Sequence, residues 1–408
     1  MRGDVKINNN EDACRCAQRI RRRISSKMVM RVLIVGAGIG GLTLAAFLRD
    51  SDIEYEIVEK APDWSRQGFL IGMWDSGRDI LKKLGLSEQF DKSGSPVRRY
   101  SMRNGKGTHL HDFDFSDFYV KYGSAMTVIR RNDLHDWLLQ KIDQSKLRMG
   151  ISVENIVQNP ERVTVTFGNG GVKDYDVVVG GDGVHSSVRS QVFGKHIESY
   201  QNWRVWYGWV DAKFGTPATI IEYVEPGEFA AIFTACGKAM VWLSAPAEHG
   251  TWDNEKGRIA RLKEIFKDEK EIMPGILDAV LDENMLPTDL VTLKLKKWYE
   301  GRVVLVGDAA HNFGPHAGVG GGMALEDAYV LAGELMKVSN LLPLSVALQN
   351  YQIERGKRLR YARGLSDRVR GATLIKSRFL RKLLDAVIPY APARFFTKNL
   401  ELLLKQEI

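Results

Sequence analysis

The spacing of apolar positions along the chain predicts two kinds of region. In the first kind, short apolar strands alternate with helices. Residues 31–35 form a run of β-forming residues, residues 42–49 repeat apolar positions at helical spacing, and residues 55–58 form a second strand. Further strands are predicted at 151–157, 163–167, 176–179 and 303–306, and a helix at 323–336. This alternation favours an α/β fold built on a parallel sheet.

The second kind of region is strand after strand. Residues 98–103 and 108–115 flank Asn104-Gly105, a dipeptide typical of β-hairpin turns. Residues 203–243 have a strand pattern throughout and are rich in aromatic residues, among them Trp203, Trp206, Tyr207, Trp209, Tyr223, Phe229, Phe233 and Trp242. Aromatic residues at this density line either the core of a sheet or a pocket for a planar or apolar ligand. These segments predict a second, mainly antiparallel sheet.

The charge of the chain is unevenly distributed. Its net charge is +8, but residues 1–30 carry 8 Lys/Arg against 3 Asp/Glu and residues 355–408 carry 14 against 4. The body between these ends is mildly acidic. The basic residues therefore do not form the positively charged patch on a folded domain that is typical of nucleic-acid-binding proteins, and we expect no nucleic-acid partner. Residues 1–29 lack a periodic apolar pattern and are predicted to be a disordered basic extension. Translation could start at Met1, Met28 or Met30.

Membrane spans, export signals and metal sites are not expected from the sequence. No apolar run approaches the ~18 residues that indicate a transmembrane helix, and the N-terminal region has no apolar core of a secretory signal. Three cysteines cannot make a disulfide framework, and no metal-ligand spacing occurs. We therefore expect a cytoplasmic protein without a metal.

A glycine-rich turn joins the first strand to the first helix. It reads Gly36-Ala37-Gly38-Ile39-Gly40-Gly41, with glycine at the first, third and sixth positions. Gly36 permits a tight turn, Gly38 lets a pyrophosphate approach the backbone, and Gly41 lets the helix lie close to the strand. The helix N-terminus offers free N–H groups to the phosphates. Because Glu59 ends the second strand and can accept hydrogen bonds from a ribose diol, an ADP-containing cofactor is predicted.

Two further motifs follow predicted strands. One is Asp182-Gly183, and the other is Asp308, which precedes a loop at 312–322 with one proline and five glycines. An aspartate at a strand end can accept hydrogen bonds from hydroxyl groups, and a glycine loop leading into a helix N-terminus suits an anionic ring edge. Asp308 could instead, or in addition, cap the following helix. His311 and His316 are candidates for acid–base catalysis, and no catalytic residue is otherwise predicted.

The three motifs, in this order over roughly residues 30–365, resemble the class A flavoprotein monooxygenases of the para-hydroxybenzoate hydroxylase type. The resemblance implies a Rossmann-like FAD-binding domain of the glutathione-reductase-like kind, with a second, mainly antiparallel substrate domain and C-terminal helices. It implies FAD as the cofactor and NADPH or NADH as a transient co-substrate. The predicted FAD contacts are Gly36, Gly38, Gly40, Gly41, Glu59, Lys60, Arg66, Arg131, Asp182, Gly183, Arg189, Asp308, Pro315, Gly318 and Gly320, with Arg130 as an alternative to Arg131.

The resemblance implies a reaction and leaves two alternatives. In the expected reaction, NAD(P)H reduces FAD, O2 adds at flavin C4a, and the resulting hydroperoxide hydroxylates or epoxidises a small aromatic, polyketide-like or isoprenoid substrate. One alternative is an FAD-dependent reductase or dehydrogenase acting on an isoprenoid or lipid. The other is a non-catalytic FAD-binding regulatory protein, which the intact motifs argue against. The family loop often reads Gly-Gln-Gly, whereas this chain has Gly318-Val319-Gly320 and lacks that amide.

The resemblance also divides the chain. The FAD-binding domain is expected to comprise 30–97, 125–200 and 290–365, the sheet domain 98–124 and 201–289, and basic C-terminal helices 366–408. In the last segment, an apolar stripe falls near helical spacing with Lys and Arg residues between its members. We expect the stripe to pack on the FAD-binding domain, and we favour this over membrane association. The sequence gives no basis for predicting an oligomeric state. The stripe comprises Leu374, Phe379, Leu380, Leu383, Leu384 and Val387.

Overall fold

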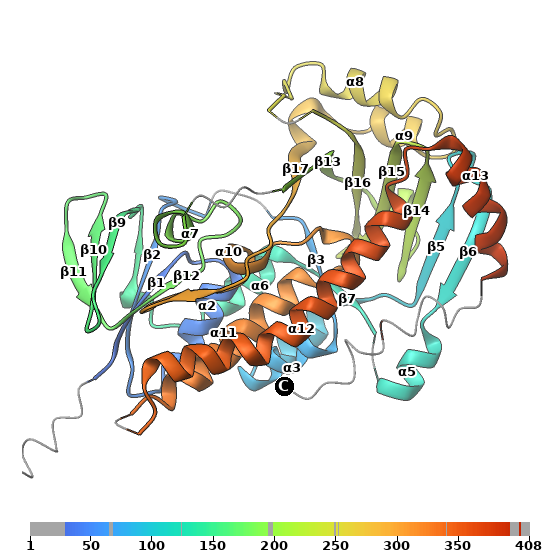
Figure 1. Ribbon diagram of the computed structural model, residues 1–408. Coiled ribbons are helices and arrows are strands. Elements are labelled where there is room, and N and C mark those ends of the chain that lie inside the picture. The colour runs from blue at the N-terminus through green and yellow to red at the C-terminus, as the bar shows by residue number, and fades with distance from the viewer. Residues whose placement is uncertain are drawn as a thin grey trace, which may run out of the picture.

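The structure is a computed structural model that describes residues 29–64, 68–123, 125–194, 199–248, 250–251, 253–339, 341–391 and 400. Residues 1–28 of the predicted extension and the predicted FAD contact Arg66 lie outside the described residues. Element labels follow Figure 1.

A six-stranded sheet with the order β18-β19-β12-β1-β2-β8 forms one half of the molecule (Figure 1). All neighbouring strands are parallel except β18 and β19. Its central strands are apolar on both faces because helices cover them, as expected for a parallel sheet. The strands are β1 Arg31–Val35, β2 Glu54–Glu59, β8 Leu147–Met149, β12 Val177–Gly180, β18 Tyr299–Glu300 and β19 Val303–Leu305.

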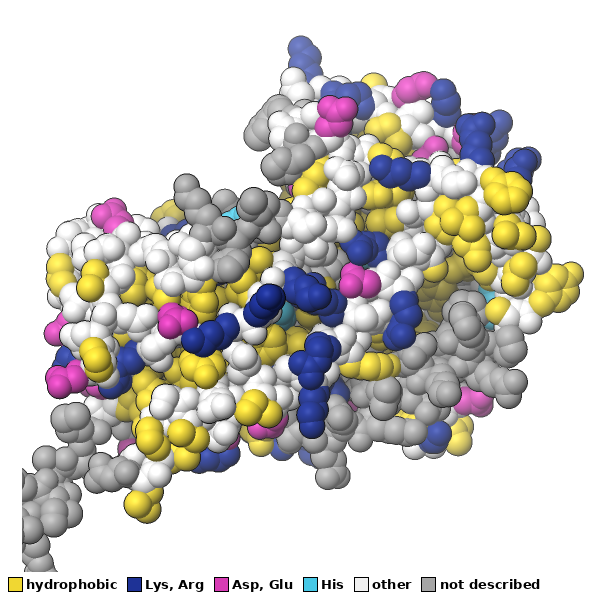
Figure 2. All heavy atoms as spheres, in the orientation of Figure 1, with side chains coloured by type: hydrophobic (Ala, Val, Ile, Leu, Met, Phe, Trp, Pro, Cys, Tyr) yellow, Lys and Arg dark blue, Asp and Glu magenta, His cyan; other side chains and the backbone are white. Residues whose placement is uncertain are grey.

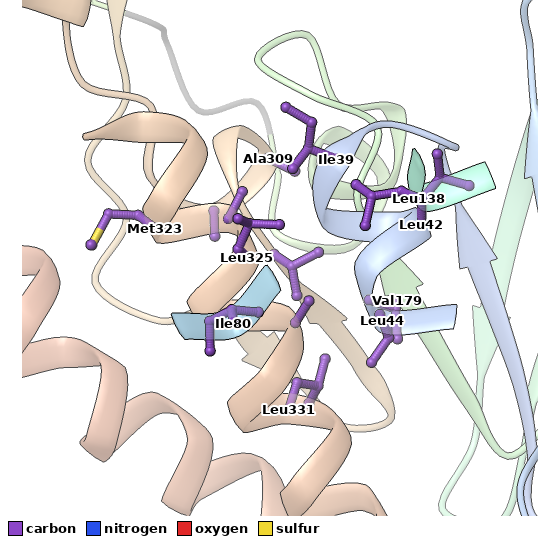
Figure 3. Packing of buried hydrophobic residues seen from close by; sticks show 14 of the residues in the cluster. Ile39, Leu42, Leu44, Ile80, Leu138, Val179, Ala309, Met323, Leu325 and Leu331 are labelled. Carbon is purple, nitrogen blue, oxygen red and sulfur yellow. The ribbon is translucent and has the colours of Figure 1, made fainter. Parts of the chain in front are cut away.

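The helix that follows the glycine turn, α2 (Ile39–Leu48), is buried on nearly every side. It packs against α11 (Gly320–Met336) as well as beside β1. Leu44 of α2, Leu325 of α11 and Ile80 of α3 (Asp75–Lys83) belong to this core (Figure 3). A helix with apolar residues all round is stable only in such a position. The predicted α/β fold is confirmed.

A seven-stranded sheet with the order β17-β13-β16-β15-β14-β5-β6 forms the other half (Figure 1). Its neighbours are antiparallel except β14 and β5, which run parallel. The predicted hairpin is confirmed as β5 and β6, and the Asn104 side chain accepts hydrogen bonds from two backbone N–H groups of the turn. The strands are β5 Arg99–Arg103, β6 His109–Asp114, β13 Ser199–Asp211, β14 Thr219–Glu225, β15 Glu228–Ala235, β16 Lys238–Pro246 and β17 Leu286–Thr292.

Two small sheets and several helices complete the described fold. The sheets have the orders β11-β10-β9 and β3-β7-β4. Their strands are β3 Leu70–Met73, β4 Ser95–Pro96, β7 Thr127–Arg130, β9 Val153–Gln158, β10 Val163–Phe167 and β11 Val172–Tyr175. The remaining helices are α4 Ser87–Ser93, α5 Ser116–Tyr122, α6 Arg131–Leu139, α7 Ser187–Val192, α8 Arg258–Ile265, α9 Met273–Asp278, α10 Asp308–His311, α12 Leu344–Thr373 and α13 Arg378–Val387.

Two sequence-based expectations about helices were wrong. Helix α11 begins at Gly320 rather than at residue 323. Glycines can adopt helical backbone angles in the first turn, where the N–H groups have no hydrogen-bond partner within the helix. The apolar stripe of α13 does not pack on the parallel-sheet half. Leu384 packs against a cluster of the antiparallel sheet, whereas Phe379 and Leu383 are exposed.

Helix α12 continues across residue 365, where the sequence suggested a boundary, and runs toward the antiparallel sheet, where α13 follows (Figure 1). The division into domains stays a prediction. Of the helices that the structure describes, none has both the length and the apolar content needed to cross a bilayer.

Candidate active site

A cavity of about 770 Å³ lies between the parallel-sheet half and the antiparallel sheet. Some residues of the glycine turn and of the segment 306–321 line one end of it, and apolar and aromatic side chains of β5, β6 and β13 to β16 line the other. The predicted site residues that line it are Gly38, Gly40, Arg131, Gly183, Asp308, Pro315, His316, Gly318 and Gly320. Residues from all three sequence motifs therefore meet at one cavity.

The glycines of the sequence motifs serve two different purposes. At Gly36, φ is +99° and an added Cβ would lie 2.6 Å from the Gly181 carbonyl oxygen, so the turn has no room for a side chain. At Gly38 the nearest atom would be 3.9 Å away, and at Gly183 and Gly320 none would lie within 4 Å. The last three glycines therefore leave backbone exposed to the cavity, so that a ligand can approach it closely.

Two helices direct their N-termini at the cavity. Helix α2 begins after Gly38 and α11 begins after Val319, and neither has a side-chain hydrogen bond at its N-cap. Their first N–H groups, with the positive ends of the helix dipoles, can bind anionic groups. This donor set fits FAD, whose pyrophosphate would lie at α2 and whose pyrimidine edge would lie at α11.

Asp308 is open to the cavity at the start of α10. Desolvation by the surrounding protein raises the pKa of Asp308, while His311 and Arg131 act in the opposite direction. No side-chain cap is present on α10, and Asp308 is its first residue rather than its N-cap. The structure therefore gives no support to the capping role, and Asp308 remains suited to accept hydrogen bonds from ribityl hydroxyl groups.

We expect Asp308→Ala to weaken FAD binding without unfolding the protein. Losing a charge-assisted hydrogen bond costs roughly 1.5–3 kcal/mol, so the FAD dissociation constant should rise about tenfold to a little over a hundredfold. Equilibrium FAD titration of the folded variant measures this change, and Asp268→Ala, at an exposed position outside the cavity lining, is the control. Earlier melting with an unchanged dissociation constant would instead support a purely structural role.

Several predicted contacts lie behind the cavity lining and hold it in place. Asp182 accepts hydrogen bonds from Ser187 N (2.7 Å) and Val188 N (3.2 Å), which stabilise the start of α7. Arg189 is 2% exposed and donates to the carbonyl oxygen of Ala309 (3.1 Å), the neighbour of Asp308. Direct contacts of Asp182 and Arg189 with the cofactor stay predictions.

Glu59 and the predicted basic FAD contacts differ in their position relative to the cavity. Glu59 accepts hydrogen bonds from Ala37 N and Ala61 N, each at 2.9 Å, so it braces the glycine turn. Lys60 is exposed and is not part of the cavity lining. Arg131 lines the cavity, whereas Arg130 is bound to the Asp133 carboxylate at 2.8 Å. The structure thus favours Arg131 over its alternative.

The two histidine candidates differ in their contacts and in whether they line the cavity. The His311 Nε2 atom lies 2.5 Å from the Asp327 carboxylate, which also accepts from Arg355 Nε at 2.7 Å. His311 is 3% exposed and outside the cavity lining, so it supports the loop rather than facing a substrate. His316 lines the cavity, with its ring centroid 5.3 Å from that of Trp242.

The environment of His316 keeps its ring neutral. Desolvation, with a smaller contribution from Arg370, lowers the pKa of His316 to about 3. Among the described residues, neither ring nitrogen has a hydrogen-bond partner, and the same is true of the nearby Trp242 Nε1 atom. His316 therefore suits hydrogen bonding to a neutral ligand group better than proton donation.

Sequence reasoning missed a carboxylic acid in the apolar wall. Glu222 of β14 is 7% exposed, lines the cavity, and accepts a hydrogen bond from the Tyr100 hydroxyl of β5. Desolvation raises the pKa of Glu222 to about 7, and the bond from Tyr100 opposes this shift. The available signal was one acid within the otherwise apolar run 220–224.

Comparisons with known proteins agree with this geometry. The family model described as FAD binding domain matches residues 29–362. The aurachin C monooxygenase/isomerase of Stigmatella aurantiaca is 30% identical over 335 residues, which are 81% of this chain and 86% of that protein. The 6-hydroxynicotinate 3-monooxygenase of Pseudomonas fluorescens is 27% identical over 321 residues, 76% of this chain and 83% of that protein.

The fold also has a close counterpart among solved structures. Klebsiella pneumoniae HpxO complexed with FAD and uric acid superposes with a TM-score of 0.83 at 23% identity, over 92% of this chain and 97% of that chain. Three observations agree on an FAD-binding monooxygenase. They are the matching family model, the similar monooxygenases and the two helix N-termini without side-chain caps at one cavity. The chain belongs to the FAD-binding domain family and is a class A FAD-dependent monooxygenase of the para-hydroxybenzoate hydroxylase type, with FAD as its cofactor.

Proposed function

We propose that this monooxygenase hydroxylates a small planar aromatic or heteroaromatic compound, and that Glu222 accepts a proton from an acidic N–H or O–H of that substrate. The observation that carries the proposal is the position of Glu222 in the apolar wall of the cavity. Among the described residues that line the cavity, only Glu222 and Asp308 are carboxylic acids. Asp308 lies at the end formed by the glycine motifs, which leaves Glu222 for the substrate.

The surrounding side chains define the shape and polarity of the ligand. Phe113, Tyr207, Phe233 and Trp242 line this end of the cavity. Aromatic walls favour a flat ring, and one acid among them favours a ligand with one matching polar group. The wall comes from segments 98–124 and 201–289, which we propose as the substrate-binding domain.

Proton transfer to Glu222 would prepare the substrate for attack. Removing a proton from a ring N–H or O–H raises the electron density of the ring, and an electron-rich ring carbon accepts an oxygen atom more readily. A base with a pKa of about 7 is matched to this task near neutral pH. Tyr100 fixes one Glu222 oxygen and leaves the other available. Bound FAD, reduced by NAD(P)H, supplies the oxygen-transfer chemistry.

The names of related enzymes support this substrate class. They include a 6-hydroxynicotinate 3-monooxygenase, a urate hydroxylase and a 2-heptyl-3-hydroxy-4(1H)-quinolone synthase, so each is named for a nitrogen heterocycle. We also propose that the enzyme works in the cytoplasm, which the three cysteines without a disulfide framework support.

Matched pairs of compounds test the proposal. Substrate-stimulated NAD(P)H oxidation and peroxide release are measured for phenols against their methyl ethers and for 4-quinolones against their N-methyl derivatives. We expect each active parent compound to lose about a hundredfold or more in kcat/KM on methylation, because the buried acid loses its partner. Equal rates for parent and methylated compounds would contradict the role of Glu222.

A further inference from the structure

Helix α13 has most of its apolar residues on the outside. Phe379 is 79% exposed, Leu383 is 52% exposed and Val387 is 55% exposed, and Tyr390 just beyond the helix is 86% exposed. Arg381 of the same helix is 1% exposed. This reverses the usual arrangement, in which an amphipathic helix buries its apolar face and exposes its charges.

The reversed orientation is fixed by contacts on the inner side of the helix. Arg381 is paired with the Asp385 carboxylate at 2.5 Å and donates to the carbonyl oxygen of Ala372 at 3.3 Å. Leu384 and Ile388 pack against the cluster of the antiparallel sheet. Because polar and apolar contacts both hold the inner face, the outward position of Phe379 follows from the fold.

The outer face is bordered by positive charge. Lys376, Arg378 and Lys382 are exposed, and Asp385, the acidic residue of α13, is paired with Arg381. At about 100° per residue, Arg378 and Lys382 lie along one edge of the apolar face. Figure 2 shows hydrophobic side chains gathered over α13, with Lys and Arg side chains near their upper border.

We propose that α13 docks the enzyme on an anionic lipid surface, with Phe379, Leu383 and Val387 entering the headgroup region. A helix with apolar anchors and a basic border is complementary to such a surface. A second copy of the chain fits this face less well, because an antiparallel two-fold contact between two α13 helices would place the basic edges of both copies on the same side. The helix follows Ala372 and Thr373, which line the cavity, so a short segment joins α13 to the cavity wall.

Vesicle flotation of the full-length protein loaded with FAD tests the proposal. We expect the protein to float with vesicles of phosphatidylserine and phosphatidylcholine, and much less with phosphatidylcholine alone. Arg378→Gln and Lys382→Gln should each lower the partition coefficient about fivefold. Phe379→Ser and Leu383→Ser should each lower it about tenfold or more.

Matched variants separate docking from general stickiness. Leu341→Ser removes another exposed apolar side chain, and Lys82→Gln with Lys92→Gln removes two exposed basic residues on α3 and α4. These controls should partition like the wild type, and FAD content and circular dichroism should be unchanged in every variant. Equal flotation with neutral vesicles, no flotation, or a dimer that Phe379→Ser dissociates without vesicle binding would each overturn the proposal.

Discussion

Gly38→Trp should give a folded protein that is colourless after purification. An added Cβ at Gly38 meets no atom closer than 3.9 Å, so the polypeptide itself has room for a side chain there. The indole would, however, occupy the approach to the N-terminus of α2, where we predict that the pyrophosphate binds. Losing two charge-assisted hydrogen bonds costs roughly 3–6 kcal/mol, which corresponds to about a hundredfold to ten-thousandfold weaker FAD binding.

The flavin absorbance of the purified variant and an FAD titration measure this effect. Gly333→Trp is the matched control, because Gly333 of α11 also has no atom within 4 Å of an added Cβ and does not line the cavity. The control should remain yellow. A Gly38→Trp protein with wild-type FAD content would show that the cofactor does not approach this turn.

Glu222→Gln should lower kcat/KM for the substrate by about a hundredfold to ten-thousandfold, the usual effect of losing a general base. The pKa of Glu222 is raised to about 7, so the group is protonated below this pH and ionised above it. The wild-type kcat/KM should therefore rise with pH through about 7 and then level off. The variant should lose this pH dependence of kcat/KM. Steady-state kinetics over an assay range of about pH 5.5–9 measure the difference.

Glu222→Gln should lower activity but raise the stability of the folded protein at high pH. Since the folded pKa of Glu222 lies above its unfolded value, the stability gained by burying the neutral acid is complete below about pH 4.5 and is lost as pH rises through about 7. At higher pH, Glu222→Gln should be more stable than the wild type by on the order of 3 kcal/mol. Thermal unfolding at pH 8 checks this sign.

Glu228→Gln separates the two effects of Glu222. Desolvation also raises the pKa of Glu228 to about 7, but Glu228 does not line the cavity. We expect its substitution to change the pH dependence of stability and to leave kcat/KM unchanged. If both glutamine variants lowered kcat/KM equally, the loss would come from altered folding rather than from a missing base at the substrate.

The cofactor end of the cavity could be predicted because its signals are local. Gly36 and Gly38 are recognisable from their spacing between a strand and a helix, and Asp308 from its place after a buried strand. Local spacing does not show which way a side chain points. For Arg189, contact with the cofactor stays a prediction, and the structure shows its guanidinium donating to the carbonyl oxygen of Ala309 behind the cavity.

The substrate end could not be predicted, because it depends on pairing between distant strands. Tyr100 and Glu222 lie in β5 and β14, which pair in parallel although they are about 120 residues apart. A shift of one residue in either strand would turn these side chains to the other face. For α13, periodicity indicated an apolar stripe, but its direction depends on the Arg381–Asp385 pair and on Ala372.

Oxygen-isotope labelling tests the central claim most directly. The FAD-loaded enzyme is supplied with NAD(P)H, an active aromatic substrate and isotopically labelled O2 in unlabelled water, and the product is analysed by mass spectrometry. The account predicts one labelled oxygen atom per product molecule and no conversion under anaerobic conditions. An unlabelled product, or substrate conversion without oxygen, would show that the enzyme is a reductase or dehydrogenase rather than a monooxygenase.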